Sequence, residues 1–209
     1  MRVPSKQELR RLWFTLHKWL GLTLALPVLL IFLSGSLLVV KNWLGASTAE
    51  GPMRVVHVLH GSLLLGRPGA RAAGGVAFLL LLSALSGLWL WWPMKGPLLR
   101  ATRWQRTPST NANIHHQAGY WLALPLVILA VTGASISFHG TFSKATGEEM
   151  LRLMRRIHDG TGMPLAWQIV IFVSGLLGAT MAVTGVIMWL KGQVRELSMR
   201  RRRVARAAD

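Results

Sequence analysis

The chain has 209 residues, of which 52% are hydrophobic and only 15% are charged, and its mean hydropathy is +0.40. This composition is too apolar for an ordinary soluble domain and indicates an integral membrane protein. The absence of cysteine excludes disulfides, thiolate iron–sulfur clusters and covalently attached c-type haem. The formal net charge of +17 does not indicate nucleic-acid binding, because the Lys and Arg residues cluster beside apolar spans, where topology and anionic lipid explain them.

Hydropathy predicts four membrane-spanning helices, at about 19–40, 72–92, 115–138 and 165–190. The first span is longer than the apolar region of a signal peptide, so we expect it to remain in the protein. Basic residues precede the first span, follow the second and follow the fourth. This bias predicts a multi-pass protein of the bacterial inner membrane with cytoplasmic termini, ending in a basic cytoplasmic tail at 194–209.

Two shorter apolar segments, 53–65 and 148–158, are predicted to be periplasmic interfacial helices. They are too short to cross a bilayer. The first is expected to stop at the turn-forming run Gly66-Arg67-Pro68-Gly69.

The second half of the chain repeats the first at a constant offset of 98 residues. The matched residues are Gly21 with Gly119, Pro27 with Pro125, Ser34-Gly35 with Thr132-Gly133, Arg54 with Arg152, Ser86-Gly87 with Thr184-Gly185, and Trp91 with Trp189. The pattern predicts an internal duplication, with one repeat at about 10–95 and the other at about 108–193, inside a single membrane domain spanning 1–209. The predicted fold is therefore all-α, with four transmembrane helices arranged as two parallel two-helix repeats.

Two histidines of each repeat follow the same offset: His17 matches His115, and His60 matches His158. If the repeats face each other across a pseudo-two-fold axis, each matched pair meets, the first on the cytoplasmic side and the second on the periplasmic side. Two imidazoles from opposite sides suit the axial positions of a haem iron, so we expect two haem b groups with these four histidines as iron ligands. A single histidine near a helix end is more often an interfacial polar residue, and the repeated placement favours ligation here.

The other three histidines, His57, His116 and His139, face Arg or Lys at this offset and are not expected to be ligands. His115 is preferred over its neighbour His116 because His17 and His115 share an HxxxG spacing. Two uses remain open for the glycines that follow the histidines: close helix packing, or room for a flat macrocycle. These glycines are Gly21, Gly35, Gly119 and Gly133.

Eight Lys and Arg residues fall on the predicted periplasmic side, which is unusually basic. Arg54 and Arg152 are repeat-related and each lies six residues before a predicted ligand, so we assign them to the propionates of the periplasmic haem. Four further arginines lack this symmetry and suit an anionic external electron acceptor: Arg67, Arg71, Arg155 and Arg156. The alternative is that they bind lipid phosphates.

Four motif pairs carry a resemblance to a known family: HKWLG with a following SG, HGSLLLG with SGLWLWW, HHQAG with TG, and IHDGTG with TGVIMWL. Over about residues 10–192 the chain resembles the PepSY-associated transmembrane family, which includes bacterial inner-membrane ferric-siderophore reductases. The resemblance implies a four-helix core with two b-type haems that passes electrons from the cytoplasmic side to periplasmic iron–siderophore complexes. Many members carry a sizeable periplasmic domain where this chain has short connections, so the chain resembles a minimal reductase or an electron conduit for a separate partner.

The expected function is transmembrane electron transfer by a di-haem b protein of the ferric-siderophore reductase type. The sequence has no GxGxxG nucleotide-binding fingerprint, so the expected electron donor is quinol or a separate cytoplasmic reductase. Two alternatives stay open: a haem b subunit serving another periplasmic redox partner, and a haem-free membrane anchor or regulatory protein. A histidine-based metal transporter is disfavoured, because every acidic residue lies outside the apolar spans.

Overall fold

The computed structural model describes residues 5–45, 47–95 and 109–208, and the regular structure in these ranges is helical. Four of the helices are long and apolar enough to cross a membrane: α1 (Lys6–Trp43), α3 (Gly66–Lys95), α5 (Thr110–Ser137) and α8 (Leu165–Ala208). Shorter helices lie between them: α2 (Gly51–Ser62), α6 (His139–Thr146) and α7 (Glu148–Asp159). These elements confirm the predicted all-α membrane fold with four spanning helices.

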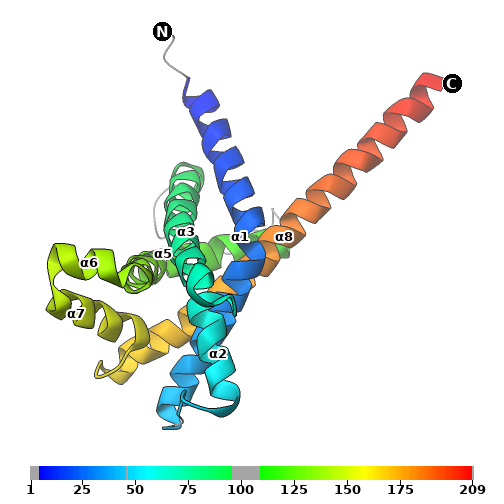
Figure 1. The fold of residues 1–209 in the computed structure, drawn as a ribbon. Helices are drawn as coiled ribbons and strands as arrows, with labels where there is room; N and C mark the ends of the chain where they lie inside the picture. The colour runs from blue at the N-terminus through cyan, green and yellow to red at the C-terminus, as the bar shows by residue number, and fades with distance from the viewer. Residues whose placement is uncertain (1–4, 46, 96–108, 209) are drawn as a thin grey trace.

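The long helices form an antiparallel ring in which α1 and α5 are diagonal to each other. Each of these two helices contacts both α3 and α8. Figure 1 shows α1 and α8 crossing near the middle and diverging toward the chain termini. The end of the ring with Lys6, Lys95, Thr110 and Ala208 is called the terminal face below, and the end with α2, α6 and α7 is called the loop face.

The short helices complete the internal symmetry of the fold. Helix α2 packs against α1 and α3 of the first repeat, and α7 packs against α5 and α8 of the second. Corresponding helices of the two repeats therefore make corresponding contacts. Helix α6 has no counterpart in the first repeat and was not predicted from the sequence.

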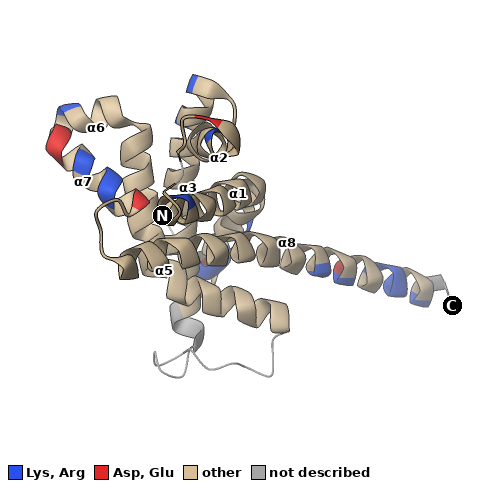
Figure 2. Ribbon diagram, turned by 90° about the horizontal axis from the view of Figure 1, so that it is seen from below, with Lys and Arg blue, Asp and Glu red and all other residues tan. Residues whose placement is uncertain are grey.

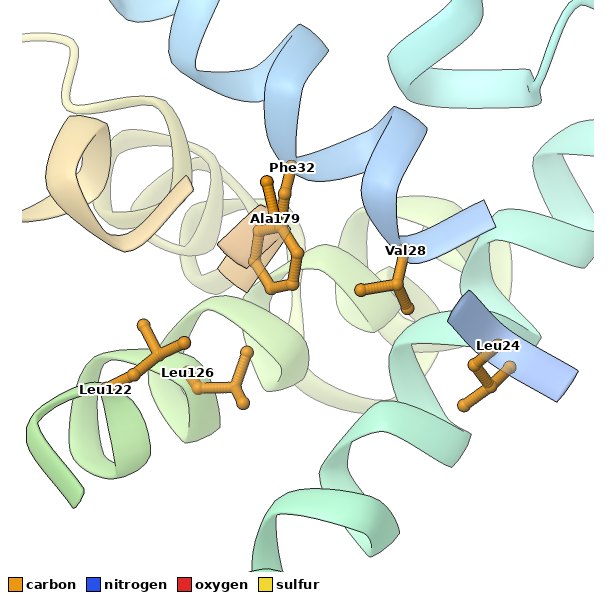
Figure 3. Close-up of a cluster of buried hydrophobic side chains, with 6 residues drawn as sticks. All are labelled: Leu24, Val28, Phe32, Leu122, Leu126 and Ala179. Atoms are coloured by element: carbon orange, nitrogen blue, oxygen red, sulfur yellow. The ribbon is translucent and has the colours of Figure 1, made fainter. Parts of the chain in front are cut away.

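An apolar cluster fills the middle of the bundle, between the two faces (Figure 3). It is built from buried side chains of α1, α5 and α8: Leu24, Val28, Phe32, Leu122, Leu126 and Ala179. Other apolar side chains of the same helices point outward, for example Leu26 and Leu124, which are 66% and 71% exposed. Outward apolar side chains at this level suit contact with lipid tails, as expected for spanning helices.

Glycines on α8 allow it to approach α1 closely. A Cβ atom on Gly178 would lie 2.5 Å from the ring of Phe32, and one on Gly175 would collide with Ser36. At the same level the hydroxyl of Ser36 donates a hydrogen bond of 3.0 Å to the Phe172 carbonyl on α8. Small residues and an interhelical hydrogen bond therefore hold α1 against α8 where no hydrophobic force drives association in lipid.

Element boundaries differ from the prediction at two places. The predicted stop at Gly66–Gly69 is wrong, because α3 already begins at Gly66. The chain turns just before this helix, at Leu63 and Leu64, which have positive φ angles of 51° and 63°. Pro68 is accommodated in the first helical turn, where its missing N–H leaves no hydrogen bond unmade. The basic tail from 194 continues α8 as a helix. Pro27 and Pro125 lie within continuous helices.

Basic residues gather on α7 and along the end of α8, as Figure 2 shows. Within the described ranges, one ion pair is formed, between Arg200 and Glu196 at 2.7 Å. The predicted cytoplasmic loop containing Arg100, Arg103 and Arg106 lies outside the described residues.

The topology can be tested by single-cysteine labelling, since the natural chain has no cysteine. We expect Gln7→Cys and Ser198→Cys, near the terminal face, to react alike with a membrane-impermeant maleimide. Ser47→Cys and Thr161→Cys, on the loop face, should react on the opposite side of the membrane. All four side chains are exposed, so accessibility depends on sidedness. Labelling of Gln7→Cys and Thr161→Cys from the same side would contradict the ring.

Candidate functional site

The structure brings two histidines from diagonal helices together near the terminal face. The rings of His17 on α1 and His115 on α5 have centroids 6.5 Å apart and an interplanar angle of 75°. His116 also lies nearby, with its ring centroid 6.4 Å from that of His115. These two helices come from different repeats, so the contact crosses the centre of the bundle.

A second histidine pair lies toward the loop face. The rings of His60 on α2 and His158 on α7 have centroids 6.0 Å apart and are tilted by 45°. Burial lowers the pKa of His60, and burial together with the nearby His60 lowers the pKa of His158 to about 4. Both imidazoles are therefore neutral at pH 7, which is the form that binds a metal ion.

The two pairs are far apart along the bundle axis. His60 hydrogen-bonds to Ser34 on α1, the helix that also carries His17. Seventeen residues separate Ser34 from His17, so at ~1.5 Å per residue the two levels are ~26 Å apart. This distance approaches the ~30 Å thickness of the hydrocarbon core.

Each of the four paired histidines contacts a Ser/Thr-Gly dipeptide on a neighbouring helix of its own repeat. Nδ1 of His17 lies 3.0 Å from the Ser86 hydroxyl, and Nδ1 of His115 lies 3.0 Å from that of Thr184. Nδ1 of His60 lies 3.3 Å from the hydroxyl of Ser34, and Nδ1 of His158 lies 2.9 Å from that of Thr132. All four contacts obey the offset of 98, and the hydroxyl residues are at most 6% exposed.

The glycine of each dipeptide leaves room for the imidazole ring. A Cβ atom would lie 2.9 Å from Cε1 of His60 if placed on Gly35, and 2.9 Å from Cε1 of His17 if placed on Gly87. The corresponding distance is 3.0 Å for Gly133 and His158, and 3.5 Å for Gly185 and His115. Two uses were open for Gly35 and Gly133: close helix packing, or room for a flat macrocycle. In the structure these glycines leave room for histidine rings.

A cavity of about 910 Å³ opens around the terminal-face pair. It is lined by both histidines, His116, the apolar residues of the surrounding helices, and four charged side chains, three cationic and one acidic: Arg10, Arg11, Lys18 and Glu196. Gly21 and Gly119 also lie on its wall, consistent with clearance for a flat group. The volume falls in the ~300–1,000 Å³ range of small-molecule and cofactor sites.

The spacing of the histidine pairs is compatible with one metal ion between the rings, and it also lies in the ~4.5–7 Å range of direct ring contacts. Two imidazole nitrogens bound at about 2.0 Å on opposite sides of one metal ion would place the ring centres about 6.3 Å apart. The observed values of 6.5 and 6.0 Å lie on either side of this figure. Among the described residues, no group of three or more His, Cys, Asp or Glu side chains could hold a metal ion. Two imidazoles alone suit a metal whose remaining ligands come from a macrocycle.

The arginines proposed for anion binding are exposed and spread over the loop face. Arg54 and Arg152 are six residues from the paired histidines, which turns them about 120° away around their helices. Arg71 lines a cavity of about 580 Å³ together with His139 and Lys144, and not with the other three candidate arginines. Arg156 instead donates a hydrogen bond of 3.3 Å to the Gly162 carbonyl.

Sequence reasoning missed the role of the Ser/Thr hydroxyls and of the cationic residues at the terminal-face cavity. The dipeptides Ser34-Gly35, Ser86-Gly87, Thr132-Gly133 and Thr184-Gly185 were recognised as repeat markers, but their partners lie 26 or 69 residues away in the sequence. The equal separations in both repeats were the available signal.

Four spanning helices carry two histidine pairs at different depths, and a cofactor-sized cavity surrounds the pair nearer the terminal face. A family model described as the PepSY-associated TM region matches residues 41–150 and 140–192. The chain therefore belongs to the PepSY-associated transmembrane family. No curated protein and no solved structure matches the chain.

The glycine contacts predict a graded response to alanine. Ala instead of Gly in a helix favours folding by up to ~1 kcal/mol, whereas forced overlap in a packed interior costs about 1–3 kcal/mol. We therefore expect Gly35→Ala and Gly87→Ala to lower the free energy of unfolding in detergent. Gly185→Ala, whose Cβ would meet its histidine at an ordinary 3.5 Å, should be neutral or stabilising. Equal losses in all three variants would contradict the close contact at Gly35 and Gly87.

Proposed function

We propose that this protein binds two haem b groups and transfers electrons across the bacterial inner membrane. The observation that carries the proposal is the repeated arrangement of four histidines as two facing pairs, with ring centroids 6.5 and 6.0 Å apart. His17 and His115 would be the axial ligands of one haem, and His60 and His158 those of the other. Bound haem supplies reversible one-electron chemistry at the iron.

The residues around each pair have separate tasks in this proposal. Neutral imidazoles supply the ligand nitrogens, and the dipeptide hydroxyls and glycines fix the orientation of the rings. At the terminal face, Arg10, Arg11 and Lys18 place positive charge on the cavity wall, where carboxylate groups of a cofactor would be stabilised. The apolar cluster around Val28 and Leu126 lines the inner end of the same cavity, so the path between the two levels is apolar.

Charge asymmetry gives the orientation of the protein in the membrane, and the proposed direction of electron transfer follows from that orientation. Lys and Arg outside the apolar spans are more numerous on the terminal side, which the positive-inside rule assigns to the cytoplasm. Electrons would then enter near His17 and His115, from quinol or a separate cytoplasmic reductase, and leave near His60 and His158 in the periplasm. The exposed arginines of the loop face favour an anionic acceptor, and the proposed acceptor is a ferric siderophore.

A second function is favoured by the short connections of the loop face. The link between α1 and α2 runs only from Leu44 to Glu50, which leaves little surface for recognising a chelate. The chain could thus act as the haem b electron-transfer subunit of another periplasmic redox protein. A haem-free anchor or regulatory role is the remaining alternative, and it does not explain why the histidines are paired.

Haem content is the first test. Protein purified from cells with adequate haem supply should contain two non-covalent haem b per chain in a pyridine-haemochrome assay. The reduced-minus-oxidised spectrum should be that of a low-spin b-type cytochrome, because both axial positions are filled by imidazole. Colourless protein would overturn the redox proposal and favour the anchor role.

Loss of haem should follow the histidine pairs. His17→Ala and His115→Ala should each remove the terminal-face haem, and His60→Ala and His158→Ala the loop-face haem, because one imidazole cannot fill both axial positions. Each variant should therefore retain about one haem per chain, with the same remaining spectrum within a pair. His57→Ala, on the same helix as His60, serves as the control and should keep both haems. Removal of the same haem by His17→Ala and His60→Ala would refute the assignment.

The acceptor site can be tested by reoxidation kinetics. Reduced protein is mixed with an anionic ferric siderophore, and haem absorbance is followed by stopped flow. The Arg67→Ala/Arg71→Ala/Arg155→Ala/Arg156→Ala variant should react more slowly at low salt, and the difference should shrink as salt screens the charges over ~8 Å. A matched variant at the opposite face, Arg200→Ala/Arg201→Ala/Arg202→Ala/Arg203→Ala, should react as fast as the wild type. Equal rates in all three proteins would favour the lipid-phosphate explanation.

A further inference from the structure

The hydrogen bonds at the four paired histidines determine which ring nitrogen carries the proton. Nδ1 of His17 lies 3.0 Å from the Ser83 carbonyl, and Nδ1 of His60 lies 2.9 Å from the Ile31 carbonyl. The carbonyls of Met181 and Leu129 occupy the corresponding positions, at the same offset of 98, beside His115 and His158. A carbonyl oxygen can only accept a hydrogen bond, so Nδ1 must carry the hydrogen in His17 and His60.

The dipeptide hydroxyls also favour a hydrogen on Nδ1. The Ser86 hydroxyl donates to the Ser83 carbonyl at 2.8 Å, and the Thr184 hydroxyl donates to the Thr180 carbonyl at 2.8 Å. The Ser34 and Thr132 hydroxyls donate to carbonyls of their own helices at 2.6 and 2.8 Å. With its hydrogen engaged, each hydroxyl offers only its lone pairs to the histidine, so it accepts from Nδ1–H. Both partners of each ring therefore favour the same tautomer.

We propose that Ser34, Ser86, Thr132 and Thr184 are positioning residues that hold the paired histidines as Nδ1–H tautomers before any cofactor binds, and that they tune the electron affinity of the bound group. The proposal rests on the proposed haem function and adds to it a role for each hydroxyl. In this tautomer Nε2 keeps its lone pair, and Nδ1 is fixed on the supporting helix, so Nε2 is the nitrogen left for the metal. Acceptors at Nδ1–H also make the imidazole a stronger electron donor.

Increased donation stabilises ferric iron more than ferrous iron, because the ferric ion carries the higher charge. Removing one acceptor from Nδ1–H should therefore raise the reduction potential. The carbonyl remains as a second acceptor in each variant, so the change should be moderate. We expect roughly a threefold to tenfold change in the equilibrium constant for reduction of the iron, which is about 30–60 mV for a one-electron couple.

The first experiment uses the protein without haem. Nitrogen-15 labelling of the histidines and NMR in detergent micelles should show four rings with a protonated Nδ1 and an unprotonated Nε2. Assignment comes from His17→Gln, His60→Gln, His115→Gln and His158→Gln, each of which should remove one such signal set. The opposite tautomer at these positions, or rapid exchange between tautomers, would overturn the proposal whether or not haem binds.

The second experiment measures midpoint potentials of the haem-loaded protein. Thr184→Val removes the hydroxyl at nearly constant volume and should raise the potential of one haem; Thr132→Val should raise that of the other. Thr184→Ser and Thr132→Ser keep a hydroxyl and should restore wild-type values. The matched control is Thr180→Val, one turn before Thr184 on α8, whose exposed hydroxyl bonds only within its helix, to the Leu176 carbonyl.

The outcomes separate this proposal from the proposed function. Haem absent from the wild-type protein would end the electron-transfer proposal. Haem present, with potentials unchanged in both valine variants or shifted equally in the serine variants, would overturn the hydroxyl role alone. Should Thr184→Val lose one haem while Thr184→Ser keeps both, the hydroxyl is required for positioning, which supports the proposal. Loss in both variants would instead indicate a purely steric role and contradict it.

Discussion

The hydrogen bond between a histidine Nδ1 and the hydroxyl of a buried Ser/Thr-Gly dipeptide recurs four times, and the rest of the structure depends on it. His17 joins α1 to α3 in this way, and His115 joins α5 to α8. His60 and His158 attach the short helices α2 and α7 to the ends of α1 and α5. One type of contact therefore fixes helix packing within each repeat and aims the imidazoles of different repeats at each other. A buried polar group without a partner would cost about 1–3 kcal/mol, so these contacts also determine which packing is stable.

Much of this architecture could be predicted from sequence, because the informative residues recur at a fixed offset. Hydropathy indicated the four spanning helices, and the match of His17 with His115 and of His60 with His158 indicated which histidines meet. The turn before α3 could not be predicted, because Gly66 and Pro68 signal a break in general, whereas here Leu63 and Leu64 adopt the strained conformation. Helix α6 was missed for a similar reason: 139–146 carries no apolar periodicity strong enough to distinguish a short interfacial helix from a loop.

The pairing of the histidines could be predicted from the sequence, and the residues that support them could not. A histidine pair follows from repeat symmetry alone, but which hydroxyl meets which Nδ1 depends on helix rotation and tilt, which hydropathy does not specify. The same limit applies to the arginines. Arg54 and Arg152 were chosen for their spacing from the histidines, and their assignment to haem propionates stays a prediction. Arg71 lines a cavity with Lys144 and His139, two residues of α6, a helix that the sequence did not predict.

The second repeat departs from the first where α6 is inserted, and this departure makes the loop face asymmetric. The histidine pairs and their hydroxyl contacts follow the offset of 98 residues, while α6 and the surface beside it do not. An external molecule approaching this face would therefore meet two unlike halves, and the cavity beside Arg71 belongs to one of them. The repeated histidine contacts thus lie inside the bundle, and the inserted helix α6 lies in a connection between spanning helices.

The apolar cluster at the centre of the bundle has an energetic consequence for any charge that crosses it. Leu24, Val28, Phe32, Leu122, Leu126 and Ala179 separate the two histidine levels with side chains that cannot relay protons. Under the proposed function, an electron would pass this layer with no titratable side chain beside it to carry a proton, so each transfer would move negative charge across the membrane. The membrane potential of a bacterium is negative inside and would assist outward transfer by about 2.3 kcal/mol per 100 mV for a full crossing. An energised membrane would then pull electrons toward the loop face even where the reduction potentials of the two levels are equal.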